Sequence, residues 1–283
     1  MLGLRLAPLV ILPVAGARPL RIPGVYQVVG IALFFVVAVL TWHLVRGDSH
    51  IPGQDRDAHR PVAGVLLMLP FAWIALLWVG LGTPWDATPP ENVMRYSVLL
   101  AAAVAVTLAL ALLRDACREA HLPSSARVSA SLGSTANLLA GATYVTWISY
   151  QLGMSATLAA TSRVPDGVAA VSNVLDTALF SACALTYLAT ACFAMAMRHA
   201  GWLSPTGARG FVVVSAIAFV FLCIRGLSFP DPTNSASAWY LQPGFIAGIP
   251  AMPWIMPYYL GVTALATLVD PRYHHRNHAT AAH

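Results

Sequence analysis

Residues 169–197 read AAVSNVLDTALFSACALTYLATACFAMAM, and this stretch decides the fold class. It is longer than the roughly 20 residues that a helix needs to cross about 30 Å of membrane hydrocarbon. Asp176 is its single charged residue. A run of this length and apolarity predicts a transmembrane helix, and the rest of the chain follows the same pattern.

The whole chain has the composition of an integral membrane protein. Of its 283 residues, 58% are hydrophobic and 10% are charged, whereas soluble domains average about 45–50% and about 25%. So few charged side chains cannot cover the surface of a soluble domain of this size. Intrinsic disorder is excluded as well, because disordered chains combine low hydrophobicity with high charge.

Seven apolar runs are long enough to cross a membrane, at about 25–45, 62–82, 96–114, 132–154, 170–197, 210–229 and 244–268. We therefore predict an all-α, multi-pass bundle of seven transmembrane helices within residues 25–268. An apolar or interfacial segment at 1–24 precedes it, and a polar cytosolic tail at 269–283 follows. Residues 1–20 suit a signal-like start, an interfacial segment or an extra helix.

Arginine distribution orients the predicted bundle. The loops at 46–60, 115–131 and 198–209, with Arg114 and the C-terminal tail, hold ten of the sixteen basic residues, and six lie on the other side. Because cytosolic loops are enriched in basic residues, we expect an outside or lumenal N-terminus and a cytosolic C-terminus. The arginines flank apolar runs, which indicates a membrane rather than a nucleic acid as the partner.

Several chemistries are excluded by missing residues. The chain has no lysine, so Schiff-base mechanisms and P-loop phosphate binding are ruled out. The four cysteines form no CxxC pair, and the chain has no HExxH, paired-aspartate or GxSxG motif. We expect neither a metal site nor a cofactor.

Asp176 is the leading candidate for a functional residue, because ionisable groups inside a membrane are costly and are functional by default. Asn173 lies one helical turn before it on the same face. Phe180, Cys183 and Tyr187 continue that face deeper. At helical rise, Asp176 lies about 9 Å below the membrane surface.

A second polar stripe runs along residues 131–154. Its members recur with helical spacing: Asn137, Gly141, Tyr144, Ile148 and Gln151. A stripe of this kind faces other helices rather than lipid, with Trp147 beside it. It serves either a substrate site or hydrogen bonding between helices.

Arg225 ends the sixth run and is expected in the same layer as Asp176, Asn173 and Gln151. An ion pair with Arg225 would hold Asp176 as a carboxylate that donates a proton poorly. Without that pair, the apolar surroundings favour the neutral acid, which is a usable general acid. Both alternatives remain open at the level of sequence.

Two further segments are expected on the same side as Asp176. The loop 82–95 carries Trp85 and Glu91 and is either a lid over a pocket or a plain connection. In the last run, Pro250, Pro253 and Pro257 each remove a backbone donor, which predicts a kinked or broken helix lining a cavity. Trp254 would add aromatic surface there.

In span number and length the chain resembles two fungal membrane families. One is the small integral-membrane terpene cyclases, in which embedded acids and aromatic cavities cyclise isoprenoids without metal. That resemblance implies Asp176 and Glu91 as acids and Trp85, Tyr144, Trp147 and Trp254 as cavity aromatics, although the last span has no acid before Asp270. The other is the RTA1-like seven-span proteins, which have an arginine late in the sixth span. The chain resembles them in Arg225, within CIRGLSFPD at 223–231.

Three functional hypotheses follow. The first is a metal-independent membrane enzyme of the lyase or isomerase type, in which Asp176 protonates a lipophilic, isoprenoid-like substrate. Asn173, Gln151 and Arg225 would position the reacting groups. The second is a receptor or lipid-handling transporter, and the third is a structural subunit of a membrane complex. Membrane lipid and a lipophilic small molecule are the expected partners.

Overall fold

The computed structural model describes residues 59–81, 87–120, 122–163, 166–225 and 251–269. Within these ranges the chain is helical, with short turns and no strand. The helices are α3 (His59–Leu81), α4 (Pro89–Glu119), α5 (Ser124–Thr161), α6 (Val168–His199), α7 (Pro205–Arg225) and α9 (Ala251–Val269). The predicted all-α class is confirmed. The first expected span, residues 1–24 and residues 270–283 lie outside the described residues.

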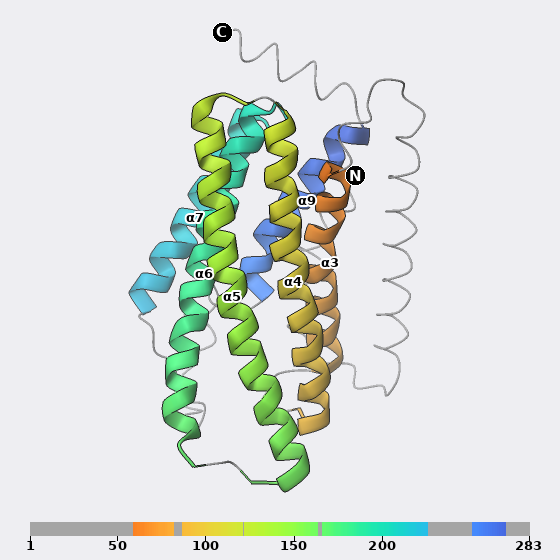
Figure 1. Ribbon diagram of the computed structural model, residues 1–283, viewed down its shortest axis with the longest axis vertical. Coiled ribbons are helices and arrows are strands. Elements are labelled where there is room, and N and C mark those ends of the chain that lie inside the picture. Colours follow the sequence, from red (N-terminus) through yellow and green to blue (C-terminus); the bar gives the residue numbers. More distant parts are fainter. Residues whose placement is uncertain (1–58, 82–86, 121, 164–165, 226–250, 270–283) are drawn as a thin grey trace.

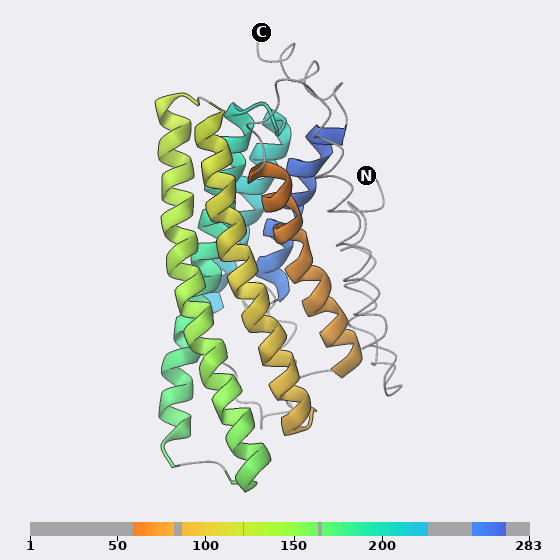
Figure 2. The ribbon, with the colours of Figure 1, turned by 45° about the vertical axis from the view of Figure 1, so that its right-hand side comes forward.

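Successive helices run antiparallel and pack against their neighbours from α3 to α7 (Figure 1). Helix α9 lies between α3 and α6 and joins the two sides of the bundle (Figure 2). The α4–α5 and α6–α7 turns are therefore at one end, together with the start of α3. We call this the arginine-rich end, because it carries Arg60, Arg114, Arg118, Arg127, Arg198 and Arg209. The opposite end, where α5 meets α6, is called the acid end.

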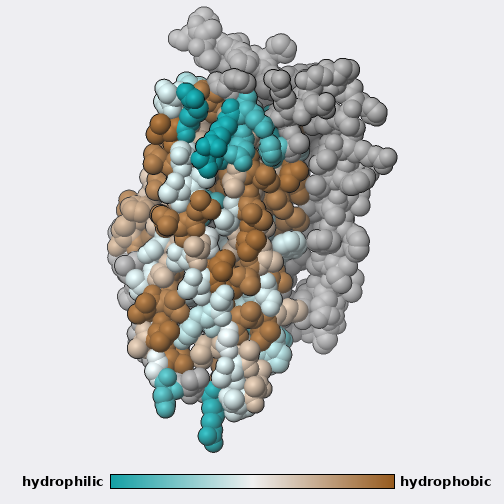
Figure 3. Space-filling view, in the orientation of Figure 1, coloured by the Kyte–Doolittle hydropathy of each residue, from teal (hydrophilic) through white to brown (hydrophobic). Residues whose placement is uncertain are grey.

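Three of the described helices are long and apolar enough to cross a membrane: Pro89–Glu119, Ala170–His199 and Pro205–Cys223. Helix α7 exposes Val213, Ile217 and Val220 along its outer side, as expected for a lipid-facing helix. Apolar side chains dominate the middle of the face in Figure 3, and polar ones gather at its ends.

Helices α4, α5 and α6 are longer than the apolar runs that predicted them. The second half of the expected loop 82–95 belongs to α4, which begins with Pro89 and Pro90. The expected loops 115–131 and 198–209 shrink to the turns between Glu119 and Ser124 and between His199 and Pro205. These helices continue through polar residues beyond their apolar runs, so an apolar run does not mark the ends of its helix.

Small residues bring the helices close together. A Cβ added at Gly261 of α9 would lie 2.5 Å from the Gly64 carbonyl oxygen of α3 and 2.8 Å from Leu67 Cβ. A Cβ at Gly141 of α5 would collide with Thr107 of α4. Close backbone approach through small residues is typical of packing between membrane helices.

Helix α9 is continuous from Ala251 to Val269 although it contains Pro253 and Pro257. Pro253 lies in the first turn, where backbone donors have no partner within the helix. The expected break is therefore absent from the described part of α9, and Pro250 lies outside it. Pro257 and Trp254 do line a cavity, as predicted.

Arg60 was expected in a loop and instead lies inside the bundle. Its side chain is 2% exposed. Its Nε donates to the Ala264 carbonyl oxygen of α9 at 3.2 Å, and its guanidinium lies 4.4 Å from the centre of the Trp202 ring. This arginine therefore ties α3 to α9 and to the α6–α7 turn.

Candidate functional site

The carboxyl group of Asp176 is held by an aromatic side chain of the neighbouring helix. Trp147 of α5 donates its indole N–H to Oδ1 of Asp176 at 2.9 Å. Asp176 is half-buried, whereas Trp147 is buried. A neutral donor fixes the direction of a carboxyl group without adding a charge. Among the described residues, the hydrogen bond from Trp147 reaches Oδ1 and not Oδ2.

Tyr96 of α4 extends this layer. Its ring meets the Trp147 ring edge-on, with the ring centres 5.9 Å apart. The Tyr96 hydroxyl lies within electrostatic range of both Arg95 and Asp176. Side chains from α4, α5 and α6 thus converge on one carboxyl group near the acid end.

Arg95 is a member of this region that the sequence analysis did not single out. It is among the most deeply buried large side chains and donates through Nη1 to Oδ1 of Asn92 at 3.1 Å. A fully buried arginine in a spanning helix is a functional candidate by the same reasoning as Asp176. Its position four residues after Glu91, on one helix face, was the available signal.

A second aromatic group lies deeper. Tyr144 of α5 packs against Trp254 of α9, with ring centres 5.6 Å apart. The Tyr144 hydroxyl accepts from Thr186 at 3.3 Å and donates to the Cys183 sulfur at 3.5 Å. These contacts join α5, α6 and α9 two turns below Asp176.

A small cavity adjoins this deeper group. Its walls include Tyr144, Thr186, Trp254 and Asn137, and its volume is about 10 Å³, room for about one water molecule. Trp254 is 3% exposed, and its indole N–H has no acceptor among the described residues. The cavity is too small for an isoprenoid, and Asp176 is not among its walls.

The predicted inward faces of α5 and α6 are confirmed. Asn137, Tyr144 and Ile148 are buried on α5. The Asn137 amide donates to the Thr107 carbonyl oxygen at 3.0 Å, which is a bond between helices. Phe180, Cys183 and Tyr187 are buried on α6.

Other predicted site residues are only partly described. Gln151 is half-buried on α5, one turn beyond Trp147. Asn173 lies in α6 and Arg225 ends α7, but their side chains lie outside the described set. Trp85 lies outside it entirely. The expected Asp176–Arg225 pair is therefore not tested by the described contacts.

Glu91 serves the start of α4. Its Oε2 accepts from the Thr88 backbone N–H at 2.7 Å and from the Thr88 hydroxyl at 2.8 Å. A glutamate three residues after a threonine that precedes a helix is a recognised capping arrangement. The described hydrogen bonds thus place the Glu91 carboxylate in a helix cap.

No group of three metal-ligating side chains occurs within the described ranges. Comparison with known proteins adds no relative, because no family model, curated protein or solved structure matches the chain. The functional argument therefore rests on the side chains themselves.

Proposed function

We propose that this chain is a seven-span membrane enzyme, with its C-terminus in the cytosol, that uses Asp176 as a metal-independent acid on a lipophilic, isoprenoid-like substrate. The observation that carries the proposal is the 2.9 Å hydrogen bond from the Trp147 indole to Oδ1 of Asp176. It orients a membrane-embedded carboxyl group through a neutral donor and surrounds it with aromatic rings. This is the chemistry expected of the small membrane terpene cyclases that the span pattern resembles.

The proposed reaction begins with proton transfer. With Oδ1 bound to Trp147, Oδ2 carries the proton and delivers it to an epoxide oxygen or an alkene carbon of the substrate. Protonation of an epoxide breaks a C–O bond and leaves a carbocation, whereas protonation of an alkene forms a C–H bond and the same kind of cation. Loss of a proton from the cyclised carbocation to the Asp176 carboxylate gives the neutral product and restores the acid without any redox change.

Aromatic side chains would stabilise the cation. Trp147 meets the acid at the ring edge that carries its N–H, Tyr96 packs against Trp147, and the Tyr144–Trp254 ring pair lies deeper. A desolvated cation–π contact contributes about 2 kcal/mol or more. Gln151, Asn173 and Arg225 are proposed to position the substrate, and Trp85 to cover it. Because Glu91 caps α4, the proposal assigns the proton transfer to Asp176.

The test compares Asp176→Asn with wild type in the same host. Asparagine keeps the acceptor oxygen for Trp147 and removes the acidic proton, so the helix contact survives while the chemistry stops. Lipophilic extracts are analysed by mass spectrometry, and membrane abundance is measured in parallel. Asp115→Asn is the matched control, because Asp115 lies at the arginine-rich end of α4 and takes no part in the proposed site.

We expect Asp176→Asn to lose a lipophilic product at unchanged abundance, while Asp115→Asn keeps it. Loss of abundance in Asp176→Asn would contradict the enzyme and favour the structural-subunit alternative. The same lipophilic products in all three strains would show that Asp176 is not a catalytic residue.

A further inference from the structure

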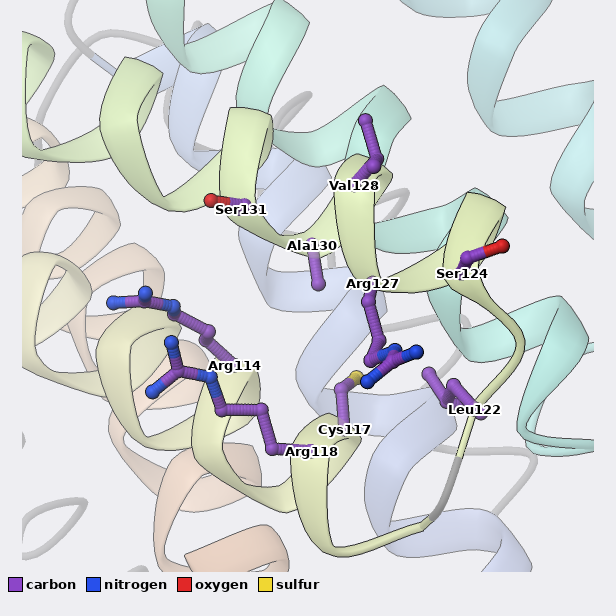
Figure 4. A pocket seen from close by; sticks show the side chains of 9 residues that line it. All are labelled: Arg114, Cys117, Arg118, Leu122, Ser124, Arg127, Val128, Ala130 and Ser131. Atoms are coloured by element: carbon purple, nitrogen blue, oxygen red, sulfur yellow. The ribbon is translucent and has the colours of Figure 1, made fainter.

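A second hollow lies far from Asp176, at the arginine-rich end. It is a cleft of about 590 Å³ between the last turns of α4 and the first turns of α5. Figure 4 shows its nine lining side chains, which come from these two helices and the turn between them. Three of them are arginines, Arg114, Arg118 and Arg127, and none is a carboxylate.

The arginines in this cleft are poorly neutralised. Arg114 and Arg118 are one helical turn apart and extend in the same direction from α4, while Arg127 reaches in from α5 (Figure 4). The Arg114 Nε is buried and has no acceptor among the described residues. Arg118 meets Asp115 only at 3.7 Å, and the nearby Glu119 is bound to His59 at 2.9 Å.

The start of α5 adds to the positive potential. Ser124 is its first residue and lines the cleft. Helix N-termini carry a partial positive charge and unpaired N–H groups, which favour phosphate. The cleft therefore combines guanidinium groups from α4 and α5 with a helix N-terminus. Guanidinium matches phosphate geometry better than a simple ammonium does.

Most of the remaining lining is apolar, with Ser131 as the exception. Cys117, Leu122 and Ala130 form the apolar lining. Val128 is also a wall residue, and it begins a stripe of exposed apolar side chains at helical spacing. Val128, Leu132 and Leu139 are 58%, 58% and 56% exposed. An acyl chain lying on this stripe would place its own headgroup at the arginines.

We propose that this cleft is a binding site for the phosphate headgroup of an anionic membrane phospholipid. The arginines and the α5 N-terminus hold the phosphate, and the α5 stripe holds an acyl chain. A general excess of basic residues on one membrane side explains arginines at this end, but it requires neither a cleft nor an adjoining apolar stripe. The proposal does not depend on Asp176 chemistry.

The test uses the full chain, purified in neutral detergent and stripped of lipid. It is titrated with phosphatidylglycerol or with phosphatidylcholine of the same acyl chains, and bound lipid is counted by native mass spectrometry. We expect about tenfold tighter binding of phosphatidylglycerol. Arg114→Gln/Arg127→Gln is expected to remove this preference. Arg209→Gln is the control, because Arg209 is exposed at the same end and does not line the cleft.

Each other outcome overturns the proposal. Equal binding of the two lipids by wild type would show that the cleft does not recognise anionic headgroups. An equal loss in Arg209→Gln would show general charge attraction rather than a site. In a third experiment, inorganic phosphate is added to the protein and its competition with bound lipid is measured. Binding of phosphate without any lipid preference would assign the cleft to a free anion. Thermal melting of every variant verifies that the bundle remains folded.

Discussion

The two ends of this bundle place charge in opposite ways. At the acid end the carboxyl group of Asp176 lies in a helix long enough to cross a membrane and accepts from a neutral indole, and the buried Arg95 donates to Asn92. At the arginine-rich end three arginines border a cleft between α4 and α5. The comparison teaches that depth decides the partner, because a charge in hydrocarbon must be held by the protein itself, whereas a charge at the surface can be met by a lipid.

Arg60 shows the same rule within the arginine-rich end. It is buried, and its partners are a carbonyl oxygen and an aromatic ring of the protein. Arg127 is exposed and lines the cleft. The first cation belongs to the packing of the bundle, and the second is available to a ligand.

The largest loss of stability is expected from a substitution that separates α9 from α3. Helix α9 contributes Trp254 to the deeper aromatic group and the Ala264 carbonyl oxygen to Arg60 at the arginine-rich end. Gly261→Val would drive a side chain into the backbone of Gly64, at a cost of about 3 kcal/mol of folding free energy. Thermal melting in detergent measures the loss.

Gly153→Val is the matched control, because a Cβ added at Gly153 has no atom within 4 Å. We expect its effect to stay within about 0.5 kcal/mol. Equal melting of the two variants would show that α9 does not lie against α3 as described.

A smaller effect is expected from Arg60→Met, which damages only the arginine-rich end. Methionine keeps most of the length and loses both the hydrogen bond to Ala264 and the contact with Trp202. These interactions together predict a loss of about 2–3 kcal/mol. Arg209→Met, at an exposed position, is expected to be nearly neutral. Similar melting temperatures of the two variants would show that the Arg60 contacts do not stabilise the bundle.

Trp147→Phe is the corresponding change at the acid end. It keeps an aromatic ring and deletes the N–H that Asp176 accepts. We expect a loss of about 1–2 kcal/mol in the wild-type background and a much smaller loss in an Asp176→Leu background. A double-mutant cycle on thermal melting reports this coupling. Additive effects would mean that the indole and the carboxyl group do not interact.

The smallest effect is expected from Tyr144→Phe, which separates the ring from the hydroxyl in the deeper aromatic group. The contact with Trp254 remains and the bonds to Thr186 and Cys183 are lost. We expect a loss of about 1 kcal/mol or less, with product formation retained. A loss of product at unchanged melting would instead give the Tyr144 hydroxyl a part in the reaction.

Helix faces were predictable from sequence, whereas contacts across helices were not. The spacing of Asn137, Tyr144 and Ile148 indicated one buried face, because the helical period fixes which residues share it. Trp147 was expected only beside that stripe. Its bond to Asp176 depends on how α5 and α6 cross, which no spacing within one helix determines.

Helix ends were the other source of error. The sequence Thr88-Pro-Pro-Glu91 is a capping signal with prolines in the first turn, yet hydropathy alone placed it in a loop. That reading hid Arg95 within the first turns of α4. The arginine cleft was missed for a related reason, since Arg118 and Arg127 were assigned to a long loop that is in fact two helix ends.

The most direct test of the central claim measures product formation and thermal melting together for wild type, Asp176→Asn and Asp176→Glu, each normalised to folded protein. The account predicts a loss of about 100-fold or more in Asp176→Asn, partial activity in Asp176→Glu and nearly unchanged melting in both. A matching fall in melting and product would make Asp176 a packing residue. Full product formation by Asp176→Asn would contradict the proposed acid.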